Sequence, residues 1–150
     1  MEAGKEFHIG PVGLGARDTL RLEMGFCLYG HDIDQSTNPL EAGLGWITKL
    51  EKGEFIGRNV IRKVKTEGLK RKLVGFSLSE KSFPRQGYTI HSNGTTIGAV
   101  TSGTFSPTLD RAIGMGYVNV ANAAPGNTIG IFIRGKEVPA AVVSVPFLKK

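Results

Sequence analysis

The residues that could do chemistry begin with a glycine-rich run that leads from Gly10 to Arg17. Gly13 and Gly15 suggest a loop that cradles a dinucleotide, but that fingerprint needs a third glycine where this chain has Asp18. A carboxylate at that position would repel a pyrophosphate, and no Gly-Lys-Ser/Thr sequence follows. The run is therefore interpreted as a tight turn into a helix.

Arg17 is the strongest candidate for a binding residue. It falls in the first turn of the predicted helix, where a positive charge opposes the helix dipole at a cost of about 0.3 kcal/mol. Hydrogen bonds from the guanidinium group to an anionic or carbonyl group can offset this unfavourable energy. The alternative is a surface ion pair with Asp18 or Glu23. Residue chemistry alone leaves both interpretations open.

Other polar clusters are better explained by loop chemistry. Four residues of one loop carry metal-ligating side chains, namely His31, Asp32, Asp34 and Glu41. Their spacing is not that of a calcium loop, and the sequence has no His-x-x-x-His pair for zinc. A later stretch is rich in hydroxyls, at Ser102, Thr104 and Ser106, but has no base nearby and is typical of turns. Neither a metal site nor a catalytic residue is predicted.

The composition is that of an ordinary globular protein, with 40% hydrophobic and 21% charged residues among 150. Its 21 glycines follow no fixed period, which indicates turns, bulges and barrel corners. Cys27 is the single cysteine, so no intrachain disulfide can form and a reducing, cytoplasmic location is expected. Its neighbours Phe26 and Leu28 favour a buried thiol over a reactive one. No apolar run approaches the ~18 residues of a membrane span.

Charge is distributed unevenly along the chain. Residues 1–60 carry six Lys or Arg against nine Asp or Glu, whereas residues 61–150 carry thirteen against four. Two halves of opposite sign indicate two structural units. A basic half also favours an acidic partner.

Hydrophobic spacing predicts the elements that must position these residues. A helix is expected over residues 15–25, followed by a polar loop at 31–45 and a short strand at 44–50. A second helix fits residues 55–65 and should end at Gly68.

Beyond a basic linker the pattern changes to six short strands, expected over residues 73–78, 88–91, 95–101, 112–120, 128–133 and 138–145. Asn93-Gly94 is a type I′ hairpin signal, and a second hairpin is expected around Gly135. Strands at this spacing predict a small antiparallel barrel. The expected fold class is α+β, a helix-strand-helix segment followed by a six-stranded antiparallel β-barrel.

Several runs resemble one known family. The sequence Gly-Leu-Gly-Ala-Arg-Asp-Thr-Leu-Arg-Leu-Glu-Met-Gly at residues 13–25, continued by Leu-Tyr-Gly-His-Asp-Ile at 28–33, resembles the glycine cleavage system T-protein, an aminomethyltransferase. Further similar runs follow in the family's order, at residues 38–44, 55–58, 97–103, 106–107, 114–118 and 146–147.

The resemblance implies a reaction and a division of the chain. The family transfers an aminomethyl group from the lipoyl arm of the acidic H-protein to tetrahydrofolate, with release of ammonia. Residues 1–69 are then expected to be the carboxy-terminal part of the folate-binding domains, and residues 70–150 the carboxy-terminal barrel domain. The family's catalytic aspartate is expected upstream, so the amino-terminal domains are a missing partner and no catalytic residue is assigned here. The motif arginine that contacts folate matches Arg17, and Asp18 is expected to orient it.

Two other functions compete with this one. The same folate module could belong to a dimethylglycine or sarcosine dehydrogenase, which a flavin-binding half upstream would reveal. A basic barrel could also bind nucleic acid, but its strands lack the interleaved aromatic residues of a stacking platform. A missing front half would also leave apolar residues without their usual neighbours, namely Leu14, Leu20, Phe26, Trp46 and Ile47.

Overall fold

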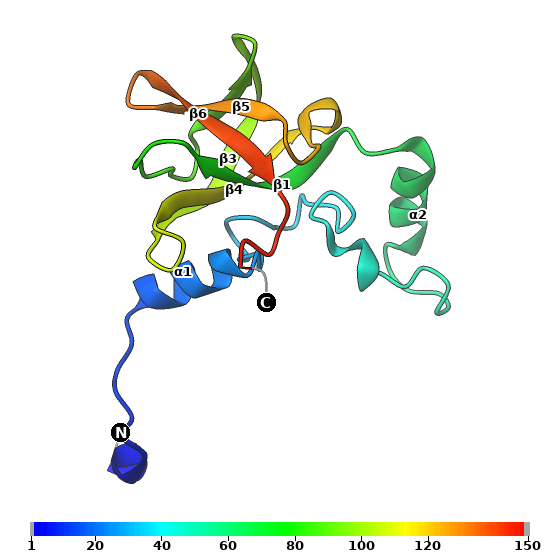
Figure 1. Ribbon diagram of the computed structural model, residues 1–150. Helices are drawn as coiled ribbons and strands as arrows, with labels where there is room; N and C mark the ends of the chain where they lie inside the picture. Colours follow the sequence, from blue (N-terminus) through cyan, green and yellow to red (C-terminus); the bar gives the residue numbers. More distant parts are fainter. Residues whose placement is uncertain (1, 149–150) are drawn as a thin grey trace.

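The computed structural model describes residues 2–148, and a closed barrel of six antiparallel strands dominates it (Figure 1). The strands are β1 (Arg71–Leu78), β2 (Thr89–Ser92), β3 (Thr95–Ser106), β4 (Arg111–Asn119), β5 (Thr128–Ile133) and β6 (Lys136–Val143). They follow the order β1-β4-β3-β2-β5-β6, and β6 pairs back with β1 to close the barrel. The predicted fold class, with its six-stranded antiparallel barrel, is confirmed.

Two tight hairpins share one backbone geometry, which the sequence predicts for Asn93-Gly94. Asn93 and Gly94 between β2 and β3 have φ of 51° and 73°. Arg134 and Gly135 between β5 and β6 have φ of 49° and 83°. Positive φ at both central residues is the mark of the type I′ turn, whose twist matches that of the paired strands.

Large apolar side chains fill the barrel, and glycines let the strands crowd around them. Phe76 and Ile90 are fully buried in this core. A Cβ on Gly114 would lie 2.4 Å from the ring of Phe76. A Cβ on Gly98 would lie 1.8 Å from the carbonyl oxygen of Tyr117. Close packing of this kind accounts for part of the high glycine content.

The helical segments lie outside the barrel. They are the 3₁₀ helices η1 (Glu2–Phe7), η2 (Leu44–Trp46) and η3 (Val120–Asn122) and the α-helices α1 (Leu14–Glu23) and α2 (Arg58–Glu67). Helix α1 packs against β3 and β4, whereas α2 stands apart from the barrel (Figure 1). None of these helices is long and apolar enough to cross a membrane, within the part of the chain that the structure describes.

Helix α1 ends in the way its sequence predicts. The amide of Gly25 donates to the carbonyl of Leu22 at 2.8 Å, and the amide of Phe26 donates to the carbonyl of Arg21 at 2.9 Å. This pair of bonds is the Schellman motif, which needs a left-handed residue after the helix. Gly25 supplies it with a φ of 67°.

The prediction of a strand over residues 44–50 is wrong. The backbone there forms η2 and turns, in which the amide of Ile47 donates to the carbonyl of Leu44 at 3.2 Å. Gly43 precedes η2 in a left-handed conformation with a φ of 74°. No other described strand pairs with this segment, so the apolar pattern alone could not make it a strand.

The assignment of residues 102–106 to a turn-rich loop is also wrong, because β3 continues to Ser106. Residues two apart on a strand share one face. The hydroxyls of Ser102, Thr104 and Ser106 therefore form a polar row along β3, where α1 packs. Small polar residues are typical of loops, and the sequence does not show that α1 packs on this strand and bonds to its hydroxyls.

Candidate functional site around helix α1

The inner face of α1 is held to the barrel by one apolar contact and a row of hydroxyls. Leu22 is fully buried and packs with Ile113 and Met115 of β4. Along β3, Ser102 accepts a hydrogen bond from Arg21, and Thr104 lies 3.5 Å from the hydroxyl of Thr19. The helix is thereby fixed in both position and rotation.

Arg21 is the centre of the polar contacts. Its Nε donates to Asp18 Oδ1 at 2.8 Å, and its Nη2 donates to Ser102 Oγ at 2.7 Å. Its Nη1 donates to Asp32 Oδ2 at 2.5 Å and to the carbonyl oxygen of Phe26 at 3.1 Å. The guanidinium therefore joins the helix, the loop after it and the barrel.

Asp32 is the buried counterpart of Arg21, with a side chain that is 0% exposed. Its Oδ1 accepts from the hydroxyl of Thr101 at 2.5 Å, and its Oδ2 also accepts from the amide of Leu28 at 2.9 Å. The hydroxyl of Tyr117 donates to the carbonyl oxygen of Asp32 at 2.9 Å. Burial of the charges is offset by this full set of partners.

Glu23 anchors the last turn of α1 by a second set of contacts. Its buried carboxylate accepts hydrogen bonds from the hydroxyls of Ser106 and Thr108, the latter at 3.2 Å. Its main-chain carbonyl accepts from the amide of Phe147 at 2.9 Å. The carboxy-terminal segment is thus tied to the same helix end.

The outer face of α1 is open to solvent, and Arg17 lies on it. Leu14 and Leu20, three residues to either side of Arg17, are 83% and 60% exposed. Arg17 is exposed and forms no ion pair with any residue of the described range 2–148. Its surface-pair alternatives are absent there, since Asp18 bonds to Arg21 and Glu23 is buried. Asp18 thus contacts Arg21, and within residues 2–148 it forms no hydrogen bond or ion pair with Arg17.

Comparison with known proteins fits this architecture. The family model of the glycine cleavage T-protein C-terminal barrel domain matches residues 71–149, and that of the GCVT N-terminal domain matches residues 1–52. The chain belongs to the glycine cleavage T-protein family.

Curated relatives cover almost the whole chain. The aminomethyltransferases of Chloroherpeton thalassium and Halothermothrix orenii are 59% and 56% identical over 100% and 99% of it. This member spans only 41% and 42% of those two relatives. The crystal structure of the glycine cleavage system aminomethyltransferase T from Bartonella henselae superposes with a TM-score of 0.87 at 40% identity, over 91% of this chain and 39% of that one.

The loop of this T-protein family member that holds His31 and Asp32 serves the structure. Asp34 accepts from the amide and hydroxyl of Ser36, and these bonds lower the pKa of its carboxyl group. Glu41 pairs with Arg71 of β1 at 3.0 Å. No cluster of metal-ligating side chains occurs among residues 2–148.

Cys27 is less buried than its sequence predicts. Its side chain is partly buried, and burial followed by the nearby charge of Asp32 raises the pKa of the thiol. A raised pKa leaves less of the nucleophilic thiolate at neutral pH.

The pairing of Arg21 with Asp32 could not be deduced from sequence, although one signal was available. Arg21 lies between two leucines, and a charge between apolar residues that become buried needs a partner. Asp32 lies in a largely polar loop and gives no such signal. The sequence does not reveal that the hydroxyls of Thr101 and Ser102, far along the chain, would complete the arrangement.

We expect Asp32→Ala to lower the free energy of unfolding by about 3 kcal/mol, because Arg21 would keep only the partly exposed Asp18 as its counter-charge. The threonine hydroxyl and the backbone amide that donate to Asp32 would also be left without an acceptor. Urea unfolding followed by circular dichroism would measure this loss. Asp34→Ala is the matched control, since Asp34 is exposed and its removal should cost less than about 1 kcal/mol. Equal losses for the two variants would contradict the central role of the buried pair.

Tyr117 gives this region a dependence on alkaline pH. Burial raises the pKa of its hydroxyl to about 12, above the ~10 of a tyrosine in an unfolded chain. The stability from Tyr117 is therefore complete below pH ~10 and is lost as the pH rises through the folded pKa of about 12.

Tyr117→Phe should cost about 1 kcal/mol near pH 8, because the bond to the carbonyl of Asp32 is lost. The difference in unfolding free energy between the parent chain and Tyr117→Phe should become smaller between pH 10 and 11, as measured by urea titration. Tyr29→Phe, which alters a side chain 71% exposed, serves as the control. A difference in unfolding free energy that grows with pH would show that the predicted pH dependence has the wrong sign.

Proposed function

We propose that the chain is the carboxy-terminal portion of a tetrahydrofolate-dependent aminomethyltransferase of the glycine cleavage system. The proposed reaction moves an aminomethyl group from the lipoyl arm of H-protein to tetrahydrofolate and releases ammonia. The observation that carries this proposal is the exposed Arg17, fixed on the outer face of a rigidly anchored helix in a member of the T-protein family. The names of the relatives agree with this activity.

Arg17 has the properties that a folate-binding residue needs. A guanidinium fork can hold a carbonyl or carboxylate group with two parallel hydrogen bonds. The exposed Leu14 and Leu20 beside it offer apolar contact to the rest of a partly aromatic ligand. In the proposed reaction folate supplies the nitrogens that take up the one-carbon unit, while Arg17 binds and orients it.

We further propose that residues 1–69 belong to the folate-binding domains and residues 70–150 form the barrel domain. The chain spans about 42% of the length of a curated relative it matches. On this proposal the catalytic aspartate lies upstream, and the chain is inactive without the preceding domains.

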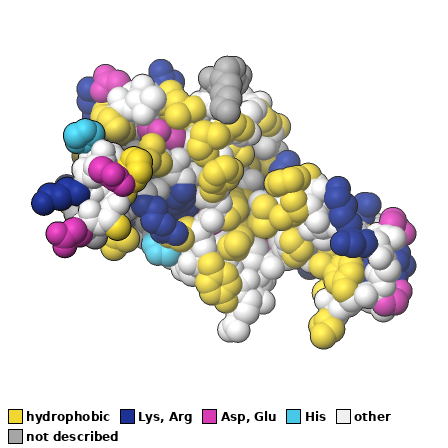
Figure 2. Space-filling model, turned by 90° about the horizontal axis from the view of Figure 1, so that it is seen from below, with side chains coloured by type: hydrophobic (Ala, Val, Ile, Leu, Met, Phe, Trp, Pro, Cys, Tyr) yellow, Lys and Arg dark blue, Asp and Glu magenta, His cyan; other side chains and the backbone are white. Residues whose placement is uncertain are grey.

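The exposed apolar residues of the first part support this proposal. Hydrophobic side chains gather across the face that carries α1 and the segment before α2 (Figure 2). All five residues expected to lack neighbours are more than half exposed: Leu14 83%, Leu20 60%, Phe26 62%, Trp46 73% and Ile47 51%. Isolated apolar residues on a surface are normal, but a gathering of this extent marks an interaction site. We assign the preceding domains of the same enzyme as its partner.

The acidic H-protein would approach a chain whose second part is basic. Residues 61–150 carry thirteen Lys or Arg against four Asp or Glu. A surface of one sign speeds the encounter with a partner of the opposite sign. The proposed location is the cytoplasm.

We expect Arg17→Ala in the longer enzyme to weaken tetrahydrofolate binding about tenfold or more, because charge-assisted hydrogen bonds are lost. Calorimetric titration would measure the affinity. Arg62→Ala on α2 removes the same charge from a side chain 46% exposed and serves as the control. Unchanged affinity in the Arg17 variant would refute the site.

We also expect the 150-residue chain alone to self-associate at concentrations of tens of micromolar, because its apolar face has no cover. Multi-angle light scattering would detect the association. Leu14→Ser should reduce it, whereas Val120→Ser, at an apolar residue 44% exposed beyond β4, should not. A strictly monomeric parent chain would count against the proposed packing face.

A further inference from the structure

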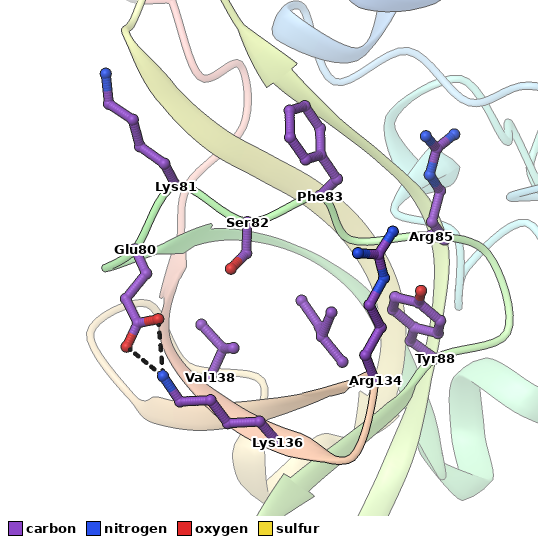
Figure 3. A pocket seen from close by; sticks show the side chains of 10 residues that line it. Glu80, Lys81, Ser82, Phe83, Arg85, Tyr88, Arg134, Lys136 and Val138 are labelled. Carbon is purple, nitrogen blue, oxygen red and sulfur yellow. Dashed lines mark hydrogen bonds and ion pairs between the residues drawn. The ribbon is translucent and has the colours of Figure 1, made fainter.

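A hollow of about 500 Å³ opens at one end of the barrel, and no residue of α1 lines it. The connection between β1 and β2 forms one wall, and the β5–β6 hairpin forms the other (Figure 3). Its size falls in the range of sites that hold small molecules. Nothing in the proposed transfer reaction uses it.

The lining of the hollow is strongly basic. Its charged side chains are Lys81, Arg85, Arg134 and Lys136, against the single acid Glu80. Two of the four cations are already paired: Lys136 lies 3.0 Å from Glu80, and Lys81 lies 3.1 Å from Asp110 outside the hollow.

The two arginines remain without a counter-charge. Neither Arg85 nor Arg134 forms an ion pair within the described residues 2–148. Arg85 comes from the wall formed by the β1–β2 connection, and Arg134 comes from the wall formed by the β5–β6 hairpin (Figure 3). Unpaired cations that line one hollow raise its positive potential and favour an anion there.

The rest of the lining suits an oxyanion. Ser82 and Tyr88 contribute hydroxyl groups that can donate hydrogen bonds. The floor is apolar, since Val138 is only 2% exposed and Ile133 packs against the core. Both arginines are exposed to solvent, so a ligand can reach their guanidinium groups above this floor.

We propose that this hollow binds a small multivalent oxyanion, a free phosphate or the phosphate group of a small metabolite, between Arg85 and Arg134. Guanidinium forks match the oxygens of a phosphate in pairs. The concave shape favours a small ligand over an acidic protein surface, which would engage the outward-facing lysines that are already paired. This inference does not depend on the proposed aminomethyl transfer.

Titration of the chain with inorganic phosphate, followed by amide chemical shifts, tests the proposal. We expect saturable shifts confined to residues 80–88 and 133–138. Arg85→Gln and Arg134→Gln should each weaken the phosphate affinity about tenfold. Arg62→Gln on α2 carries the same charge loss and should leave the affinity unchanged. Thermal unfolding would confirm that each variant is folded.

Two further titrations separate the alternatives. Methyl phosphate should bind as well as or better than inorganic phosphate if the ligand is a metabolite, and more weakly if it is the free ion. A ten-residue polyglutamate peptide that shifts the same amides, while phosphate does not, would overturn the proposal in favour of a protein-docking surface. Equal weakening by Arg62→Gln and the two pocket variants would overturn it in favour of diffuse electrostatic attraction.

Discussion

The buried pair of Arg21 and Asp32 connects three parts of the chain that lie far apart in sequence. Arg21 belongs to α1, Asp32 to the loop that follows, and the hydroxyls that satisfy them to β3, 81 residues beyond Arg21 in the case of Ser102. Removing two charges from water costs several kcal/mol, so the pair persists only because every polar atom has a partner. No buried side-chain nitrogen or oxygen in the described part of the chain lacks one.

This arrangement gives α1 two faces with different tasks. On the inner face, Arg21 and Glu23 form hydrogen bonds that hold the helix to the barrel and the loop. On the outer face, Arg17, Leu14 and Leu20 are exposed to solvent. A binding residue on a rigid helix needs less ordering when its ligand arrives. Helix α1 therefore joins the barrel to the surface on which the proposed folate contact lies.

Much of the fold follows from local sequence chemistry, because hairpins and helix ends are set by nearby residues. The Asn93-Gly94 turn, the Schellman end at Gly25 and the presence of six strands were predictable from the sequence, although the second half of β3 was not. Residues 44–50 were not, because strand formation depends on a neighbouring strand that no local pattern supplies. The polar row of β3 was also missed, because its hydroxyls are bonded to α1, a partner distant in sequence.

The candidate site also contains residues that the sequence could reveal and residues that it could not. Arg17 stood out in sequence because an arginine in a first helical turn is unfavourable without a ligand. Arg21 and Asp32 did not stand out, since their partners come together only when the barrel has formed.

Closure of the barrel also limits how the molecule can assemble. Because β6 returns to β1, every strand of the described barrel has a neighbour on both sides, and no edge strand is offered to another chain. Contacts with other copies or domains are then made by side chains, and such contacts are reversible. The fold thus carries an uncovered apolar face without also offering a template for strand-by-strand growth into fibres.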